Sequence, residues 1–532
     1  MREKLYVPMR RLEAFNSLTV VLIVAPLCVG VQMPARPAVQ LDEAVFFPFD
    51  DFSFPFTHDV HFQLVAGEKQ DPVLGLGQPG DPDADVVMFY GTVIRVGDEF
   101  RMWYMGREFS QDFYKYGPFR VCYAVSKDGI HWEKPELGLV EYQGDRKNHL
   151  VGLLQSDGSY GPIHMIQTLV LYEPEDPDPN RRFKMFYEID NYIRTGQASV
   201  EQDTVPGLVA FSPDGLRWTG SPRNPVVRGN LEPSGLTKFD GCYYVNAHHI
   251  LPSAYGGRVT VTYASYDFEN WTESVNKGFR RAFPSSGIHT GNLREQVHMG
   301  ASLWNRGNVV LGIYGMWHGD ESDDTLKLTM DLGLIVSHDA IHFREPTTDF
   351  ALIPAKGEKD GVWPALMQGQ AFANVKDKTY IWYGSWDEYA WRDKNPINGG
   401  GKVRLATWDR DRLGFFHPKS VTGGAWLFGK DNPHAITRTL MIDENDTIFV
   451  NAEGLSNEGY LALELLDERF QPLSGFSGPH CAVLSKPGLR QPVHWRGKAQ
   501  LKGFDKPIRI RVDWEGRSRQ DVRLYAVYVS PK

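Results

Sequence analysis

A short turn recurs five times along the chain, each time after an apolar segment, and this repeat limits the possible folds more than any other feature. Each copy has an aromatic residue four positions after an Asp. Asp and Ser side chains accept hydrogen bonds from turn amides, and a following Gly tolerates positive φ. We therefore predict a β-hairpin at each copy, with the aromatic ring packed over the turn. The five marker residues are Asp128, Asp214, Asp267, Asp339 and Asp411.

The distance between markers predicts the size of each repeat. Successive markers lie 86, 53, 72 and 72 residues apart, which is enough for four strands with insertions. A second pair of strand-like segments precedes each marker, with alternating aromatic and β-branched residues bounded by Gly, Asp and Asn. The pattern predicts an all-β chain in which residues 42–420 form a five-bladed β-propeller.

The C-terminal part has a different pattern. Short alternating segments at 447–451, 461–466, 508–512 and 524–529 follow one another with Gly and Asp turns between them. Close spacing of short strands is typical of a sandwich. We predict a β-sandwich module over residues 425–532.

The N-terminus resembles an export signal. Basic residues precede an apolar stretch at 18–31, and small residues follow at 33–38. The stretch is short for a membrane span. We expect a signal peptide and leader over residues 1–40, a secreted or periplasmic protein, and no membrane span in the mature chain. An uncleaved membrane anchor is the alternative.

The remaining cysteines and the charge exclude several classes of site. Cys122, Cys242 and Cys481 have no metal-ligand spacing, so we interpret them as buried thiols. We expect no metal centre in the active site and no cofactor; a structural calcium ion at the acidic stretch 81–85 stays open, although the stretch does not fit an EF-hand. A net charge of −9 without a basic cluster in the mature chain excludes a typical nucleic-acid surface.

Two segments carry a resemblance to a known group. Residues 121–141 are similar to the first blade of five-bladed propeller glycoside hydrolases of families 32, 43 and 68. Residues 463–477 and 494–497 are similar to the sandwich module found in secreted proteins with a family 32 N-terminal-like propeller. The resemblance covers nearly all of the mature chain. It implies a carbohydrate substrate, and a site with three carboxylates in the axial funnel of the propeller.

The resemblance is most specific in the third blade. Family 43 has a Glu-Gly-Pro-x-Leu-x-Lys-x-x-Gly-Tyr-Tyr run there, and this chain keeps the Glu, Leu, Lys, Gly and second Tyr at the same offsets. The matching residues are Glu232, Leu236, Lys238, Gly241 and Tyr244. The match implies that Glu232 is the general acid.

Other site residues are implied by their positions at the starts of the blades. The propeller-plus-sandwich group has an acid eight residues before its Tyr-Gly-Thr run, and counting back from Gly91 leads to Asp83, which is the expected base or nucleophile. Asp360 and Glu295 lie at the entries to the fifth and fourth blades. The candidate substrate-binding residues are Tyr90, Arg107, His298 and Trp363. Two departures from family 43 stand out, because Tyr90 and Gly91 replace an Asp-Pro pair and Gln167 lies where the second blade would have an Asp.

We therefore expect an exported glycoside hydrolase that cleaves a poly- or oligosaccharide with paired carboxylates. One alternative is a non-catalytic carbohydrate-binding propeller, which the two departures favour. Another is a sialidase-like hydrolase, although the related Asp-box has one residue more than the turn found here. The sequence does not determine the sugar, the stereochemical outcome or the oligomeric state.

Overall fold

The fold consists of strands. The computed structural model describes residues 43–108, 118–165, 167–188, 206–228, 231–250, 258–273, 276–281, 295–318, 329–356, 365–386, 401–419, 432–497, 501 and 504–531. These residues form β-strands and short 3-10 turns (η1, Pro179–Arg181; η6, Gly478–His480; η7, Arg519–Asp521), and none of them lies in an α-helix. The predicted all-β class is confirmed.

Five antiparallel meanders follow one another along the chain, and we number them 1 to 5. Meander 1 is β5 (Val86–Val96), β6 (Glu99–Arg107) and β7 (Arg120–Ser126), and meander 2 is β10 (Thr168–Tyr172), β11 (Phe183–Glu188), β12 (Gly207–Ser212) and β13 (Arg217–Gly220), extended by β8 (Gly152–Leu154) and β9 (Tyr160–Pro162). Meander 3 is β14 (Glu232–Phe239), β15 (Cys242–Ile250), β16 (Arg258–Ser265) and β17 (Asn276–Phe279), and meander 4 is β18 (Gln296–Asn305), β19 (Val310–His318), β20 (Thr329–Ser337) and β21 (Ala351–Ile353). Meander 5 is β22 (Ala365–Val375), β23 (Lys378–Trp386), β24 (Val403–Asp409) and β4 (Glu68–Lys69).

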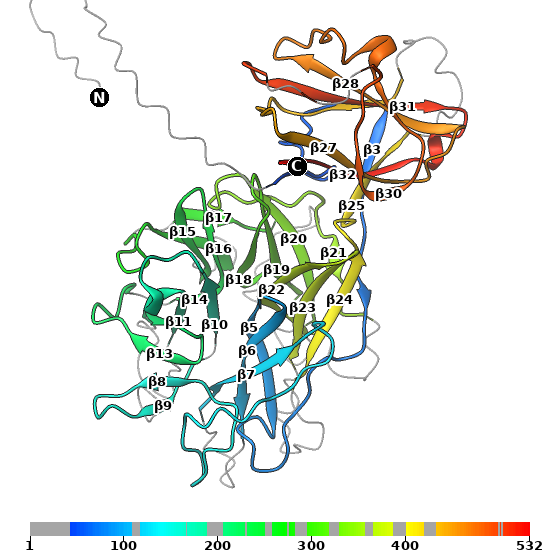
Figure 1. Ribbon diagram of the computed structural model, residues 1–532. Coiled ribbons are helices and arrows are strands. Elements are labelled where there is room, and N and C mark those ends of the chain that lie inside the picture. Colours follow the sequence, from blue (N-terminus) through cyan, green and yellow to red (C-terminus); the bar gives the residue numbers. More distant parts are fainter. Residues whose placement is uncertain are drawn as a thin grey trace, which may run out of the picture. The chain divides into compact units, whose positions relative to one another are not determined.

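The first strands of the five meanders form a closed ring. β5 contacts β10, β10 contacts β14, β14 contacts β18, β18 contacts β22, and β22 returns to β5 (Figure 1). β22 and β5 are parallel, so the first residues of these two strands lie at the same end of the ring. A ring of sheets with one innermost strand each is the arrangement of a propeller. The five meanders contain the five predicted turns in the predicted order.

The last meander is closed by an N-terminal strand. β4 pairs with β24, so a segment that precedes meander 1 in the sequence completes meander 5. This pairing joins the two ends of the ring and leaves the edge of β24 covered.

The C-terminal strands form two further sheets around their own hydrophobic core. One sheet contains β1 (Ala44–Phe46), β3 (Val60–Leu64), β25 (Gly414–Pro418), β27 (Asp446–Glu453), β30 (Gly488–Pro492) and β32 (Arg523–Pro531), and the other contains β2 (Phe56–His58), β26 (His434–Ile436), β28 (Gly459–Asp467), β29 (Ala482–Leu484) and β31 (Ile508–Gly516).

Three N-terminal strands belong to these sheets. β1 pairs with β32, β2 with β26 and β3 with β25, and Figure 1 shows β3 in blue among orange and red strands. The sequence predicts that residues 42–420 belong to the propeller. The strands between residues 44 and 64 lie elsewhere because their pairing partners are at least 350 positions away in the sequence, where a local pattern gives no signal.

The turns have the predicted hydrogen bonds. In the first copy the Ser126 hydroxyl accepts from the amide of Gly129 at 2.8 Å, and the Asp128 carboxylate accepts from the next two amides. The Trp132 indole donates back to the Gly129 carbonyl at 3.0 Å. The second and third turns repeat this pattern, including the bonds from Trp218 and Trp271.

The turns of meanders 1 and 2 also accept a hydrogen bond from the meander that precedes each of them in the ring. Trp382 on β23 donates to the Gly129 carbonyl in the turn of meander 1 at 2.8 Å, and Trp103 on β6 donates to the Gly215 carbonyl in the turn of meander 2 at the same distance. Both indoles are fully buried. The turns therefore fix the angle between neighbouring meanders as well as closing their own hairpins.

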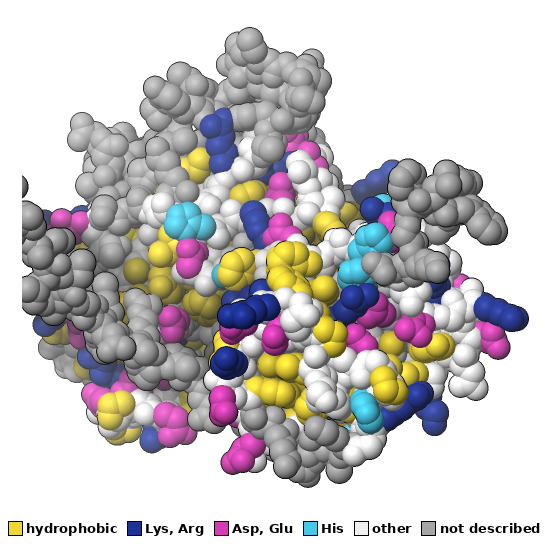
Figure 2. All heavy atoms as spheres, turned by 90° about the horizontal axis from the view of Figure 1, so that it is seen from above, with side chains coloured by type: hydrophobic (Ala, Val, Ile, Leu, Met, Phe, Trp, Pro, Cys, Tyr) yellow, Lys and Arg dark blue, Asp and Glu magenta, His cyan; other side chains and the backbone are white. Residues whose placement is uncertain are grey.

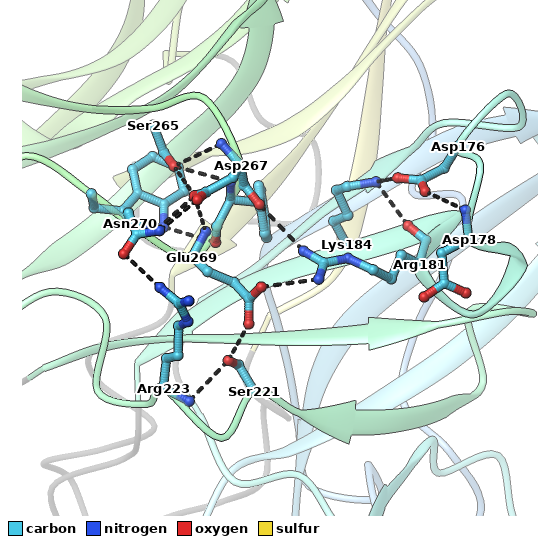
Figure 3. A network of polar contacts seen from close by, with 12 residues as sticks. Asp176, Asp178, Arg181, Lys184, Ser221, Arg223, Ser265, Asp267, Glu269 and Asn270 are labelled. Carbon is cyan, nitrogen blue, oxygen red and sulfur yellow. Dashed lines mark hydrogen bonds and ion pairs between the residues drawn. The ribbon is translucent and has the colours of Figure 1, made fainter.

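The turn of meander 3 makes its contact through charged groups (Figure 3). Arg181 of η1 donates to the Glu269 carboxylate at 2.9 Å and to the Asp267 carbonyl at 3.2 Å. Ser221 donates to Glu269 and Arg223 donates to the Asn270 side chain. Meanders 2 and 3 are thus joined by a polar network.

The fifth copy of the turn differs from the others. Asp411 is fully buried, and its carboxylate accepts bonds from Arg306 at 2.5 Å, Tyr528 at 2.9 Å and Asn374 at 3.0 Å. Arg306 follows β18, whereas Tyr528 lies on β32. Asp411 therefore links meanders 4 and 5 to the C-terminal sheets and does not hold turn amides as the repeat predicts.

Substitution of Gly129 tests the role of the turns. Its φ is +78°, and a Cβ there would lie 2.7 Å from Cζ2 of Trp382. We expect Gly129→Ala to lower the free energy of unfolding by about 2 to 3 kcal/mol, from backbone strain and displacement of the indole. Gly138→Ala is the matched control, because φ is +68° there and nothing lies within 4 Å of the added Cβ. Equal losses in urea unfolding would show that the contact with Trp382 contributes nothing.

Candidate active site

A group of polar side chains gathers where the first strands begin, at one end of the ring. Glu232 is the first residue of β14 and lies directly opposite His248 of β15. The Oε2 atom of Glu232 is 3.2 Å from Nε2 of His248. Arg258, the first residue of β16, is close enough to act on Glu232 electrostatically. Meander 3 thus supplies a carboxyl, an imidazole and a guanidinium.

Meanders 1 and 4 supply a buried aromatic layer beside this group. The Tyr90 hydroxyl of β5 lies 3.3 Å from Nδ1 of His298 of β18. The His298 ring stacks on Trp317 at 5.2 Å, and the Arg258 guanidinium lies 5.0 Å from the centre of the Trp317 indole. Tyr90, His298 and Trp317 are at most 6% exposed, whereas the Glu232 side chain is 39% exposed. Glu232 is therefore the accessible member of the group.

Bulges in the first strands give these residues their positions. The pairing shifts between Met88 and Thr92 in β5, and between His298 and Ala301 in β18. Gly91 lies in the first bulge, where a Cβ would be 2.0 Å from the Trp103 carbonyl oxygen. Only a glycine allows this close approach of two strands. The bulge redirects the chain immediately next to Tyr90.

The electrostatics favour a protonated Glu232. Burial by surrounding protein atoms raises the pKa of Glu232, and the positive charge of Arg258 opposes this only in part. Burial also raises the pKa of Tyr90, with a contribution from the charge of Glu232. Burial together with Arg258 and His248 holds the pKa of His298 well below its usual value, so this imidazole is neutral. A raised pKa is the property that a general acid needs, because it increases the fraction of the carboxyl that can donate a proton.

Asp83 is fully buried in a separate cluster within meander 1. Its carboxylate accepts from Tyr104 at 2.7 Å and from Lys134 at 2.6 Å, and its other oxygen is 3.2 Å from His149. Burial raises the pKa of Asp83, but the hydrogen bond and charge of His149 and the charge of Lys134 outweigh it and bring the value to about 2. Asp83 is therefore a carboxylate at neutral pH, and its partners come from β6 and the loops after β7.

The Glu295 carboxylate also pairs with residues other than Glu232. Its carboxylate pairs with Arg281 at 2.6 Å and with His318 at 2.8 Å, and the far side of the His318 ring contacts Asp331 at 3.0 Å. Burial raises the pKa of Glu295, but its bonds with His318 and Arg281 lower it overall. Among the described residues, neither Asp83 nor Glu295 contacts Glu232.

Because the imidazole of His318 is paired with two carboxylates, we expect the free energy of unfolding to depend on pH. Burial lowers the pKa of His318, but bonds to Asp331 and Glu295 outweigh it and raise the value to about 9. The folded state therefore binds the proton more tightly than the unfolded state, in which the pKa is about 6.5. The stabilisation is complete below pH 6.5 and is lost as the pH rises through 9.

We expect His318→Gln to cost about 2 to 3 kcal/mol of unfolding free energy at pH 6 and much less at pH 10. Denaturant unfolding of both proteins at the two pH values measures the difference. A difference that stays constant with pH would contradict the charged state of His318.

The other predicted residues divide into two groups. Asp360 and Trp363 lie outside the described residues, so their roles stay predictions. Arg107 ends β6, and its guanidinium lies 4.8 Å from the ring centre of Phe119. Phe119 belongs to the same hydrophobic cluster as Tyr90 and Trp317. The structure therefore places Tyr90 and His298 near Glu232, and Arg107 contacts a member of the hydrophobic cluster that contains Tyr90.

Three residues of the group were missed by the sequence analysis: His248, Arg258 and Trp317. The sequence signal for a residue opposite Glu232 is the Asp240-Gly241 turn between β14 and β15. Pairing the residues of the two strands outward from this turn places the end of β15 opposite Glu232. Nothing in the sequence connects Trp317 to this end of the ring.

No group of three or more His, Cys, Asp or Glu in the described ranges is arranged to hold a metal ion. On the face shown in Figure 2, Lys and Arg side chains are interspersed with Asp and Glu. No helix within the described part of the chain is long and apolar enough to cross a membrane.

Comparisons with known proteins give similarities to solved structures alone. No family model matches the sequence, and no curated protein matches it. The chain is similar to a glycosyl hydrolase from Bacteroides ovatus, with 15% identity, a TM-score of 0.44, and coverage of 66% of this chain and 96% of the other. It is similar to a family 43 arabinoxylan arabinofuranohydrolase from Bacillus subtilis, with 9% identity, a TM-score of 0.38, and coverage of 87% and 99%.

A family 32 β-fructofuranosidase from Bombyx mori gives 11% identity, a TM-score of 0.40, and coverage of 87% of this chain and 94% of that one. All of these TM-scores lie below 0.5, so the similarities carry no argument about the site. The function proposed next is based on the geometry around Glu232 and on the sequence.

Proposed function

We propose that the protein is an exported glycoside hydrolase that acts on a poly- or oligosaccharide, with Glu232 as general acid. The observation that carries this proposal is an accessible carboxyl with a raised pKa at the end of the ring, next to buried Tyr90, His248 and His298. Glycosidic bond cleavage needs such a group, because the leaving oxygen must receive a proton. The N-terminal leader supports export.

The neighbours of Glu232 suit both states of the acid. Burial raises the pKa of the carboxyl and so increases its protonated fraction before the reaction. After proton transfer, the new carboxylate lies 3.2 Å from His248 and within the electrostatic reach of Arg258. Both groups stabilise the negative charge that forms as the glycosidic bond breaks. His248 and Arg258 are therefore positioning and stabilising groups in this proposal.

The second carboxylate of the reaction would come from another meander. Glycosidases place the two carboxyl groups about 5 Å apart for retention and about 6.5 to 9.5 Å apart for inversion. The Asp83 carboxylate contacts Lys134 and His149, and the Glu295 carboxylate contacts Arg281 and His318. None of these contacts includes Glu232. Of the predicted carboxylates, Asp360 at the entry to meander 5 is the remaining choice for the base or nucleophile.

One observation favours a non-catalytic carbohydrate-binding protein as the second choice. Asp83, which replaces the first-blade acid in the sequence comparison, is fully buried and paired with Lys134 and His149. If no second carboxylate reaches the sugar beside Glu232, the site would bind the sugar without cleaving it.

A glycan panel decides between the two functions. Purified full-length protein is incubated with neutral and acidic poly- and oligosaccharides, and new reducing ends are measured. Release from at least one glycan is the expected result. Binding to a glycan by calorimetry without release from any of them would overturn the hydrolase and favour the binding protein.

A further inference from the structure

A cavity lies between meanders 5 and 1, at the opposite end of the strands from Glu232. Its volume is about 750 Å³. Its walls come from the first residues of β23, from β24 and β4, and from the turn that follows β7. The lining residues that matter for its chemistry are Glu68, Ile130, His131, Trp132, Lys378 and Tyr380.

The strand directions separate this cavity from the candidate active site. In meander 5, Val375 at the end of β22 pairs with Lys378 at the start of β23, and Ala365 at the start of β22 pairs with Trp386. Lys378 therefore lies at the end of the sheet remote from the beginning of β22. A strand of nine residues spans about 30 Å. The cavity cannot be part of the group around Glu232, and no step proposed above uses it.

Two aromatic rings in the cavity are held in fixed positions by one buried indole. Trp132 and Tyr380 both pack edge-to-face against Trp382, with ring centres 6.3 Å and 5.6 Å apart. Trp132 is also fixed by its bond to the Gly129 carbonyl at 3.0 Å. Both rings remain partly exposed, and Ile130 beside them is 38% exposed. The rings form an apolar wall that needs no rearrangement before it accepts a ligand.

The polar groups of the cavity disfavour an anionic ligand. Lys378 pairs with Asp409 at 2.8 Å and His131 contacts Asp128 at 2.7 Å, so the two basic side chains already have acidic partners. A phosphate or carboxylate ligand would require a cation without such a partner. The Glu68 carboxylate and the Tyr380 hydroxyl form no hydrogen bond with other described residues. They can bond to hydroxyl groups of a ligand.

We propose that this cavity is a second binding site for a neutral saccharide chain. The apolar faces of pyranose rings pack on aromatic side chains, and their hydroxyl groups bond to carboxylate and hydroxyl oxygens at the rim. The proposal rests on the proposed function in one respect, since the saccharide would be of the class that the funnel cleaves. A long chain bound here would be retained on the enzyme between cleavage events and would increase the local substrate concentration.

Affinity electrophoresis of the full-length protein in gels that contain a neutral polysaccharide tests this site. Wild type, Tyr380→Ala, Glu68→Ala and Tyr266→Ala are run on the same gels. Tyr266→Ala is the matched control, because this aromatic residue is 77% exposed in the corresponding turn of meander 3 and does not line the cavity. Melting temperatures of all four proteins identify any variant that fails to fold.

We expect Tyr380→Ala to weaken retardation by about tenfold in dissociation constant, Glu68→Ala to weaken it less, and Tyr266→Ala to behave as wild type. Equal retardation of wild type, Tyr380→Ala and Glu68→Ala, or no retardation of wild type by any neutral polysaccharide, would overturn the proposal. Binding of peptides alone would overturn it as well. Because the reducing-end assay measures cleavage separately, either proposal can fail while the other is retained.

Discussion

Replacement of Glu232 with Gln is expected to reduce the turnover of a cleaved glycan by at least about 100-fold, because the amide cannot donate the proton that the leaving oxygen needs. The substitution keeps the size of the side chain, so glycan binding and the melting temperature should change little. The loss should be smaller for synthetic substrates whose leaving group departs without a proton. Steady-state kinetics on both substrate types measure the effect.

Glu345→Gln is the matched control for this substitution. Burial also raises the pKa of Glu345, but its carboxylate accepts a hydrogen bond from Tyr314 in meander 4, away from the group around Glu232. Turnover should be unchanged in this variant. A similar loss in both variants, or a full loss for Glu232→Gln on substrates with good leaving groups, would contradict the role of Glu232 as proton donor.

Asp411→Asn is expected to have the largest effect on stability, with a loss of about 3 to 5 kcal/mol in the free energy of unfolding. The reason is that Arg306, only 8% exposed in its side chain, would lose the carboxylate that neutralises it. Asn tolerates the positive φ of +60° at this position, so the backbone conformation need not change. Urea unfolding at pH 7 gives the loss directly.

The neighbouring Asp409→Asn provides the comparison. Asp409 pairs with Lys378 at 2.8 Å, but both side chains are 47% exposed. Exposed pairs of this kind contribute about 0 to 1 kcal/mol. Comparable losses for the two variants would show that the buried contact among Arg306, Asp411 and Tyr528 does not hold the two parts of the molecule together.

The turns show what could be predicted from the sequence. The Ser and Asp side chains and the terminal aromatic residue act within about six positions of one another, so their hydrogen bonds follow from local sequence. Four of the five turns have the predicted bonds to the Asp carboxylate. Asp411 differs because its partners, Arg306 and Tyr528, come from distant parts of the chain.

The site shows where prediction from the sequence ends. Glu232 was identified by its offset from Leu236, Lys238 and Gly241, and the structure adds its environment. His248 could not be assigned with the same certainty. An uninterrupted hairpin from the pair Phe239 and Cys242 would place His249 opposite Glu232, but a register shift between Pro233 and Gly235 places His248 there. A bulge of one residue thus decides which imidazole contacts the acid.

Asp83 illustrates a second reason why the site could not be predicted fully from the sequence. Its offset from Gly91 matched the acid of related propellers, but the side chain lies against Gly106 and next to Cys122, over the second and third strands of meander 1. Sequence distance fixes how far a residue is from a strand along the chain, but not the direction in which the connecting loop carries it. Lys134 and His149, from later loops, hold it there.

The central claim is that Glu232 protonates a glycosidic oxygen, and a crystal structure of the Glu232→Gln protein with an intact oligosaccharide tests it most directly. The account predicts a glycosidic oxygen within about 2.6 to 3.2 Å of the side chain at position 232, with the sugar next to Tyr90 and His248. A sugar bound at this end of the ring with every glycosidic oxygen more than about 10 Å from that side chain would contradict it.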